Sequence, residues 1–216
     1  MTILLFRLDP YIREVDATVM RAEDGFVVLD RTCFFPQGGG QAGDTGEISG
    51  SKIVNTLSDG EEVRHITKGT TPFKSGQRVH GAIDWQRRYR IMRLHSASHL
   101  VYYAMQEVFG DRCRPASSGM LDDVKDRSDY HFDVPLDRGK LALVEDKVNL
   151  LIADGLPVTH SLEPGSEERL LWEVAPFPAM ACGGTHIRNT AEIGRVSLKR
   201  GSKPGRGRER IELTLA

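Results

Sequence analysis

Residues 85–109 have the sequence WQRRYRIMRLHSASHLVYYAMQEVF. Apolar residues recur in this stretch with a period near 3.6, which predicts one long amphipathic helix. The apolar stripe consists of Ile91, Leu94, Ala97, Val101, Ala104 and Val108. Gly110 follows directly and is placed to end the helix. The sequence before the helix is rich in strands, so the predicted domain boundary separates residues 1–85 from residues 86–216.

Two histidines lie one turn apart within this helix. His95 and His99 are at positions i and i+4, so both imidazoles are on the same side. Far downstream, Cys182 and His186 have the same spacing in a glycine-containing segment, CGGTH. One thiolate and three imidazoles suit zinc better than calcium or magnesium. The sequence therefore predicts one Zn²⁺ per chain, held by these four residues, at a site where the metal performs the catalysis.

A set of four protein ligands leaves two roles open for the metal. A structural zinc ion closes its coordination with all four ligands, whereas a catalytic ion keeps one position for water or substrate. No glutamate follows His95, so the HExxH motif of metalloproteases is absent. We expect a Lewis-acid or positioning role, with His186 loosened or displaced by the substrate.

The first 85 residues contain short apolar or alternating runs separated by turn signals. Strands are predicted at residues 17–22, 25–29, 52–57, 62–66 and 79–85. Short strands at this spacing predict a small β-barrel. Residues 34–44, FFPQGGGQAGD, interrupt it, and their consecutive glycines allow positive φ angles and close approach of backbone amides to a ligand. A hairpin tip that binds nothing is the alternative for this loop.

The second half of the chain predicts a mixture of helices and strands. Residues 111–129 are expected to form a loop and residues 130–134 a strand. Asp137 is placed to cap a helix that ends before Gly155. A strand at 157–162, a short acidic helix at 164–172 and strands at 194–199 and 209–215 complete the prediction. The fold class is therefore α+β, with a small barrel followed by an α+β domain.

The composition is that of an ordinary globular protein. Of the 216 residues, 39% are hydrophobic and 27% charged, and no apolar run is long enough to span a membrane, so we expect no membrane partner. Three cysteines and the absence of signal-peptide features indicate a reducing, cytoplasmic location. No P-loop or dinucleotide fingerprint occurs, so no nucleotide cofactor is expected.

Any RNA-binding face must be local, because the net charge is only −1. Arginines at the start of the predicted helix oppose its dipole, which favours contact with an anion. A glycine-rich basic loop before the last strand suits contact with a phosphate backbone. Solvated charge is the alternative in both places. The predicted RNA-binding residues are Arg87, Arg88, Arg90, Arg93, Lys199, Arg200, Lys203, Arg206 and Arg208.

The motifs PQGGGQ, HSASH, CGGTH and GRGRERIEL occur together in this chain. In combination the sequence resembles alanyl-tRNA editing proteins of the AlaX type, which are free-standing relatives of the editing domain of alanyl-tRNA synthetase. The N-terminal segment is similar to that of the medium-length subgroup. The resemblance implies a translation-protein-like barrel followed by a two-layer α+β domain shared with the threonyl- and alanyl-tRNA synthetase editing domains. The zinc ligands of the family fall on His95, His99, Cys182 and His186.

The resemblance further implies a zinc-dependent aminoacyl-tRNA deacylase. Its substrate would be tRNA(Ala) mischarged with serine, or with glycine. Because a pocket cannot exclude the smaller alanine by size, serine must be selected through hydrogen bonds to its hydroxyl group. The polar groups expected to bind the substrate are Gln37, Gly38, Gly39, Gly40, Gln41, Ser117 and Ser118.

Two other functions fit the same residues. A zinc-stabilised tRNA-binding module without catalysis would lose RNA binding on zinc removal but would have no ester hydrolysis to lose. An enzyme that edits another aminoacyl-tRNA, such as the serine editing of the threonyl system, would use a similar metal site. The glycine-rich loop favours the alanyl branch through the resemblance, and the oligomeric state is left open.

Overall fold

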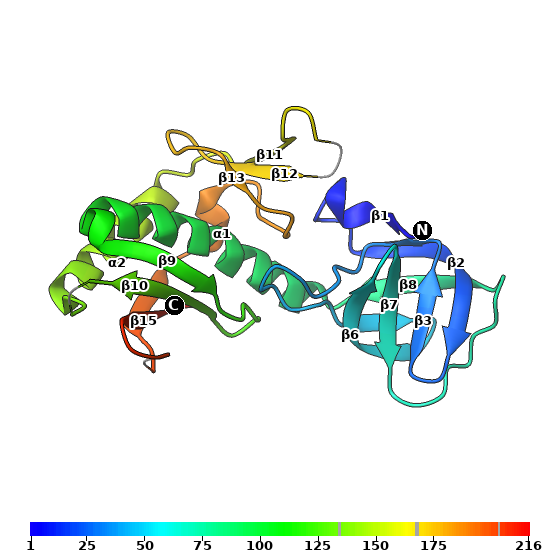
Figure 1. Ribbon diagram of the computed structural model, residues 1–216. Coiled ribbons are helices and arrows are strands. Elements are labelled where there is room, and N and C mark those ends of the chain that lie inside the picture. The colour runs from blue at the N-terminus through cyan, green and yellow to red at the C-terminus, as the bar shows by residue number, and fades with distance from the viewer. Residues whose placement is uncertain (134, 167–168, 203) are drawn as a thin grey trace. The chain divides into compact units, whose positions relative to one another are not determined.

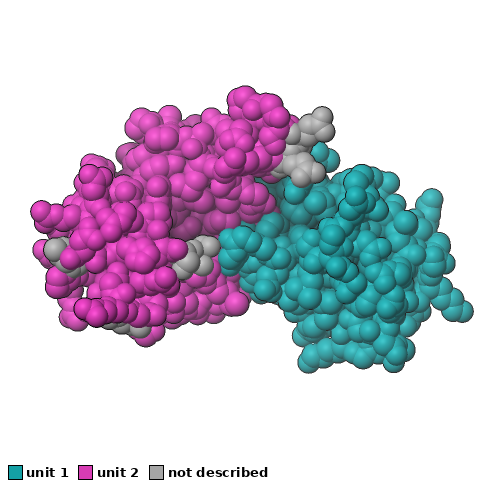
Figure 2. Space-filling view, viewed as in Figure 1, with its two compact units in different colours: residues 1–89 teal, residues 90–216 magenta. Residues whose placement is uncertain are grey.

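The computed structural model describes residues 1–133, 135–166, 169–202 and 204–216 (Figure 1). The chain divides into two compact units, Met1–Tyr89 and Arg90–Ala216, which Figure 2 colours separately. The division falls one helical turn after the predicted boundary at residue 85, because the first residues of helix α1 (Trp85–Phe109) pack within the first unit. Within the described residues, no helix is long and apolar enough to cross a membrane.

Unit 1 is built around a closed β-barrel. Its six strands follow one another around the barrel in the order β2 (Glu14–Glu23), β3 (Phe26–Leu29), β7 (Glu62–Thr67), β6 (Ser51–Asp59), β5 (Gly46–Ile48) and β8 (Arg78–Ile83). Each strand pairs antiparallel with its neighbours. The expected small barrel is therefore present. The sequence did not predict β5, the short strand that joins β6 to β8 and closes the ring.

Alternating side chains fill the interior of the barrel. Val15, Ala17 and Val19 of β2 are buried at every second position, as the two-residue period of a strand requires. They pack with Phe34 and Ile48 in one apolar cluster. Strands β1 (Ile3–Leu4) and β4 (Arg31–Thr32) form a separate parallel pair.

Unit 2 contains a four-stranded antiparallel sheet and most of α1. The sheet has the order β14 (Val196–Arg200), β15 (Arg208–Leu215), β10 (Asp126–Phe132) and β9 (Cys113–Ser118). A smaller sheet has the order β11 (Thr159–Leu162), β12 (Leu170–Glu173) and β13 (Met180–Ala181). Short 3₁₀ helices occur at Leu5–Arg7 in unit 1 and at Gly110–Arg112 and Thr190–Ile193 in unit 2.

Both predicted long helices are confirmed. Helix α1 has the expected bounds, and Gly110 ends it with a positive φ of 60°. Helix α2 (Arg138–Ala153) begins after Asp137, whose carboxylate accepts hydrogen bonds from the backbone of Gly139 and Lys140. Asn149 of α2 exchanges hydrogen bonds of 2.9 and 3.0 Å with the Val196 backbone, which ties the helix to the edge strand β14.

Two predicted segments are wrong. In the acidic helix predicted at 164–172, residues 170–172 belong instead to strand β12, where Leu170 pairs with Leu162 of β11, and residues 167–168 lie outside the described residues. The loop at 111–129 contains β9 and the first residues of β10, which pair with each other and with β15. Both errors concern segments whose conformation is decided by pairing with other strands. Val134, expected in the strand at 130–134, lies outside the described residues.

Candidate metal centre

The four predicted ligands come together in unit 2. His95 and His99 lie on α1, Cys182 directly follows β13, and His186 lies in the loop after it. One ligand atom from each residue lies within 4.8 Å of those of the other three. Folding therefore joins the pair on the helix to the pair in the glycine-containing segment.

The imidazoles present their Nε2 atoms to the thiol. Cys182 Sγ lies 3.2 Å from His186 Nε2 and 3.5 Å from His95 Nε2. A tetrahedral zinc ion with bonds of about 2.3 Å to sulfur and about 2.0 Å to nitrogen sets these ligand atoms about 3.5 Å apart. The observed separations suit such an ion.

His99 gives an independent sign that a cation belongs in the cluster. Its Nε2 is buried and has no hydrogen-bond partner among the described residues. A polar atom buried in this way loses its hydration without compensation. A metal ion bound to Nε2 would supply the missing partner, so the residues present fit the predicted metal.

Burial keeps the clustered imidazoles neutral. It lowers the pKa of His95 to about 4, and it lowers the pKa of His99 and His186 well below the ordinary value. Nearby histidines contribute to each shift because positive charges at these distances repel one another. Neutral imidazole is the form that binds metals. Burial also raises the pKa of the Cys182 thiol, so a cation is needed to stabilise its thiolate.

Aromatic side chains that the sequence did not single out border the cluster. Trp172 of β12 is fully buried, and its ring centroid lies 4.8 Å from that of His99. The ring of Tyr103 stacks near Trp172 and on Phe177, with centroid distances of 6.3 and 4.6 Å. The Tyr103 hydroxyl donates to the Pro178 carbonyl at 2.5 Å. Of these rings, the fully buried Trp172 places apolar surface directly against His99.

His160 is a further histidine at the cluster. It lies on β11, its ring stacks on that of His186 with centroids 5.2 Å apart, and it is exposed to solvent. No motif indicated it, because it is a lone histidine on a strand that contains no other expected ligand.

Comparison with known proteins reveals a relative that aligns with the chain almost from end to end. Over its whole length the chain is 33% identical to the alanyl-tRNA editing protein AlaX-M of Pyrococcus horikoshii, of which it covers 98%. The chain belongs to the AlaX family of alanyl-tRNA editing proteins. Residues 9–87 match the family model of class II (A) tRNA synthetases. Residues 173–212, which include Cys182 and His186, match the model of the threonyl and alanyl tRNA synthetase second additional domain.

Alanine–tRNA ligases are also relatives of this AlaX family member. The chain is 32% identical to the enzyme of Ignicoccus hospitalis and 31% identical to that of Metallosphaera sedula, in each case over 96% of its length. It spans only 25% of either ligase.

The glycine-rich loop of this AlaX family member forms a tight turn in unit 1. Gly38 and Gln41 exchange backbone hydrogen bonds of 3.1 and 2.9 Å. Between them, Gly39 and Gly40 have φ angles of 57° and 89°. Positive φ at both central residues is typical of a type I′ hairpin turn, which glycine adopts without strain. Gly38, Gly39 and Gly40 are exposed, so their backbone is accessible to a ligand.

The other predicted substrate-binding residues differ in their surroundings. Gln37 is exposed, and its side-chain oxygen accepts a hydrogen bond from Asn55 at 3.3 Å. Gln41 is only 1% exposed, so its side chain lies inside unit 1 instead of on the surface of the turn. Ser117 and Ser118 belong to β9 in unit 2, and their side chains lie outside the described part of the chain.

Arg88 is a correction to the predicted RNA-binding set. It is 0% exposed and forms a two-pronged ion pair with the buried Asp44, with Nε at 2.9 Å from Oδ1. It also donates to the carbonyls of Cys33 and Pro10 at 2.8 and 3.1 Å. Its charge is therefore used inside unit 1, where it holds the end of the glycine-rich loop.

The other arginines of α1 bind backbone carbonyls. Arg87 donates to Gly43 at 2.7 Å, which adds a second link to the glycine-rich loop within unit 1. In unit 2, Arg93 donates to the Ile193 carbonyl at 2.6 and 2.8 Å, and the exposed Arg90 donates to the Asp123 carbonyl at 2.9 Å.

The basic loop before β15 divides into paired and unpaired cations. Arg200 forms a two-pronged ion pair with Glu209 at 2.7 and 2.8 Å, and Lys199 lies 3.4 Å from Glu212. Arg206 and Arg208 are exposed and have no ion pair within the described residues. Lys203 lies outside the described residues.

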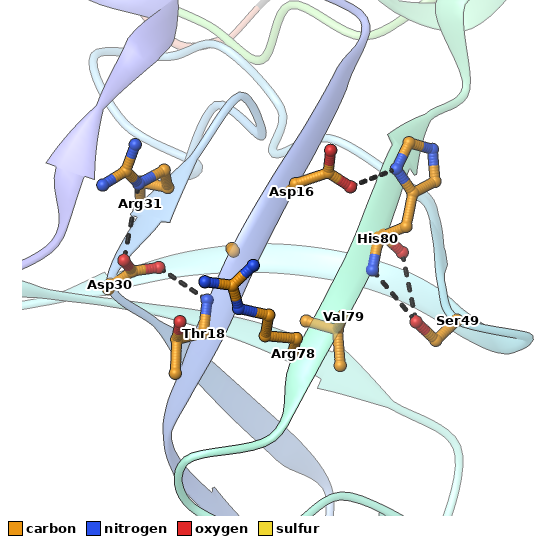
Figure 3. A pocket seen from close by; sticks show the side chains of 9 residues that line it. Asp16, Thr18, Asp30, Arg31, Ser49, Arg78, Val79 and His80 are labelled. Carbon is orange, nitrogen blue, oxygen red and sulfur yellow. Dashed lines mark hydrogen bonds and ion pairs between the residues drawn. The ribbon is translucent and has the colours of Figure 1, made fainter.

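A hollow of about 460 Å³ on the surface of unit 1 contains none of the predicted site residues. Figure 3 shows that its charged side chains belong to both signs. His80 Nδ1 lies 2.9 Å from Asp16 Oδ1, which raises the pKa of His80, and Asp30 accepts from the Thr18 amide at 2.8 Å. The balance of charge indicates no preference for an anion.

Proposed function

We propose that this chain is a zinc-dependent aminoacyl-tRNA deacylase that hydrolyses mischarged tRNA(Ala), chiefly Ser-tRNA(Ala) and also Gly-tRNA(Ala). The convergence of His95, His99, Cys182 and His186 in one buried cluster carries the proposal. The relationship to a protein named for alanyl-tRNA editing supports the choice of tRNA(Ala). The reaction breaks the ester between the amino acid and the tRNA, with water as the second substrate.

The four residues would hold zinc through three neutral imidazoles and one thiolate. When bound, the metal supplies Lewis-acid polarisation or orientation of the ester and water. An aminoacyl ester is already activated, so hydrolysis needs correct placement more than a strong base. The chain supplies that placement by carrying two ligands on α1 and packing the ring of His99 beside the buried Trp172.

The side of the cluster from which a substrate would approach is indicated by exposure. His95 and His186 are buried, whereas His99 and Cys182 are only half-buried. His186 also has contacts at both ring nitrogens, with Ser96 and Cys182. The greater exposure of Cys182 favours approach of the substrate from its side of the cluster, and displacement of His186 by the substrate stays a prediction.

Serine would be distinguished from alanine by hydrogen bonds that only a hydroxyl group makes. We assign this selection to the exposed glycine turn, together with Gln37, Ser117 and Ser118, whereas the buried Gln41 supports the turn through its backbone hydrogen bonds to Gly38. The backbone at Gly39 is open, with nothing within 4 Å of the place that a side chain would take. The tRNA backbone would be bound by exposed cations, among which Arg90, Arg206 and Arg208 have no carboxylate partner in the described part of the chain.

A deacylation assay tests the proposal. Seryl-, glycyl- and alanyl-tRNA(Ala) are incubated with the protein, with and without a chelator, and beside a His95→Ala variant. We expect rapid loss of serine, slower loss of glycine, retention of alanine, and no hydrolysis after chelation or in the variant. Binding of tRNA without hydrolysis would instead identify a zinc-stabilised RNA-binding module. Preference for another mischarged tRNA would place the chain outside alanyl editing.

A further inference from the structure

Ser96 lies between the two ligand pairs and belongs to neither. It is the second residue of the HSASH segment, and its side chain is 0% exposed. Its Oγ lies 3.1 Å from His186 Nδ1 and accepts a hydrogen bond from the Ile187 amide at 3.3 Å. One hydroxyl group on α1 therefore contacts both a ligand of the second pair and the backbone that follows this ligand.

The two nitrogens of His186 have different neighbours. Nε2 faces the thiol of Cys182 at 3.2 Å, so Nε2 is the atom turned toward the centre of the cluster. Nδ1 faces Ser96 on the other side of the ring. An imidazole that binds a metal through one nitrogen carries its proton on the other, and it normally donates that proton to a neighbouring acceptor. A serine oxygen has two lone pairs and can accept from both Nδ1–H and the Ile187 amide.

We propose that Ser96 is a positioning residue for the metal site. Its oxygen holds the proton of His186 on Nδ1 and fixes the plane of the ring, which leaves the Nε2 lone pair directed at the metal position. Its second hydrogen bond holds the loop after His186 against α1, beside His95. The two ligand pairs are thus linked before any metal binds. The inference rests on the proposal that the cluster holds a metal.

Ser98 provides a matched control on the same helix. It occupies the position before His99, as Ser96 does after His95, and it is half-buried. Its hydroxyl donates to the His95 carbonyl at 2.8 Å, one turn back in α1, and this hydrogen bond involves no ligand imidazole. Replacing either serine by alanine removes the same atom, but only Ser96→Ala removes an acceptor from His186.

The test compares zinc affinity by competition with a chromophoric chelator, together with the absorption spectrum of the Co²⁺-substituted protein. For Ser96→Ala we expect zinc affinity to fall about 10- to 100-fold and the cobalt spectrum to change. Ser98→Ala is expected to match the wild type in both measurements, and Ser96→Thr is expected to restore most of the affinity. Unchanged affinity and spectrum in Ser96→Ala would overturn the proposal.

A measurement on the wild type remains decisive if a variant folds poorly. Long-range ¹H–¹⁵N correlation of the zinc-bound protein reports which nitrogen of His186 carries the proton. A proton on Nδ1 is expected, and coordination through Nδ1 would refute the role of Ser96. Loss of affinity in both Ser96→Ala and Ser96→Thr with an unchanged His186 tautomer would assign the effect to packing. If the wild type binds no metal, it is the proposed function that fails.

Discussion

His65 is a histidine whose burial favours the neutral ring. It lies in β7 inside the barrel, fully buried, with Nδ1 at 3.0 Å from the Val27 carbonyl and Nε2 at 2.8 Å from the Thr32 hydroxyl. The carbonyl can only accept, so Nδ1 donates and Nε2 accepts from Thr32. Burial lowers the pKa of His65 to about 4. The folded state therefore binds this proton less readily than the unfolded state.

Unit 1 should lose stability as the pH falls from about 6.5 toward 4. The unfolded chain takes up the proton near pH 6.5, whereas folded His65 resists it until about pH 4. Between pH 7 and 5 this residue alone should lower the free energy of unfolding by about 2 kcal/mol. Urea denaturation monitored through Trp85 measures the effect, and His65→Gln should lack this part of the pH dependence. An identical pH dependence in the variant would contradict the assignment.

The buried ion pair between Arg88 and Asp44 predicts a large effect of one substitution. Asp44→Ala leaves the Arg88 charge buried without a carboxylate, which should reduce the free energy of unfolding of unit 1 by about 3–5 kcal/mol. The surface pair between Asp59 and Arg64 supplies the control, because Asp59→Ala at a half-exposed site should cost less than about 1 kcal/mol. Chemical denaturation of the two variants compares these values, and equal losses would refute the role of burial.

At the scale of elements, the glycine turn should respond to the shape of the substituted residue. Gly39 has a φ of 57°, which asparagine tolerates and a β-branched residue does not. Gly39→Val should strain the turn and lower the ratio of serine to alanine ester hydrolysis, whereas Gly39→Asn should preserve the fold and test side-chain bulk alone. Rates on seryl- and alanyl-tRNA(Ala) give the ratio. A ratio unaltered in both variants would remove the turn from the specificity site.

Substitutions in the basic loop should affect either RNA binding or stability, depending on whether the replaced arginine forms an ion pair. Replacing the unpaired Arg206 and Arg208 by alanine should weaken tRNA binding and reduce the slope of log affinity against log salt by about one for each phosphate that the variant no longer binds. Arg200→Ala breaks the ion pair with Glu209 and should mainly lower the melting temperature of unit 2. Filter binding at several salt concentrations distinguishes the variants. An unchanged slope in the double variant would exclude these two arginines.

The elements that the sequence predicted correctly are those whose signal is local. Helix α1 has a 25-residue periodic pattern, and Asp137 marks the start of α2 by its own capping bonds. Strands β5, β9 and β12 lacked such signals. All four residues of β11 are exposed, so neither it nor its partner β12 shows clear alternation. Their conformation depends on pairing with other strands, which the residues of a single segment do not reveal.

The residues of the candidate site also divide into those with a local signal in the sequence and those without one. The ligand spacing of His95 with His99, and of Cys182 with His186, is local and was recognisable. The burial of Arg88 was not, because its partner Asp44 lies 44 residues away and a charged residue is normally expected at the surface. The position of Ser96 between the ligand pairs likewise depends on a contact 90 residues away.

For the whole molecule, removal of the metal should affect the two units unequally. All four ligands belong to unit 2, and each unit contains one of the two tryptophans, Trp85 and Trp172. A ligand present at 100 times its dissociation constant stabilises the unit that binds it by about 2.7 kcal/mol. In Trp85→Phe the remaining Trp172 reports on unit 2, so chelation should lower the melting temperature measured with this variant. In Trp172→Phe the remaining Trp85 reports on unit 1, and its melting temperature should stay unchanged. Equal shifts would place the metal effect outside this cluster.

The reactivity of the cysteines of this protein should report whether the metal site is occupied. Cys33 and Cys113 are free thiols, fully buried, and burial raises the pKa of each to about 12, so they resist alkylation in the folded chain. Cys182 is the one half-buried thiol of the three. Because the same sulfur would coordinate the metal, the number of thiols that react in the native protein counts empty sites, without an added label or an engineered residue.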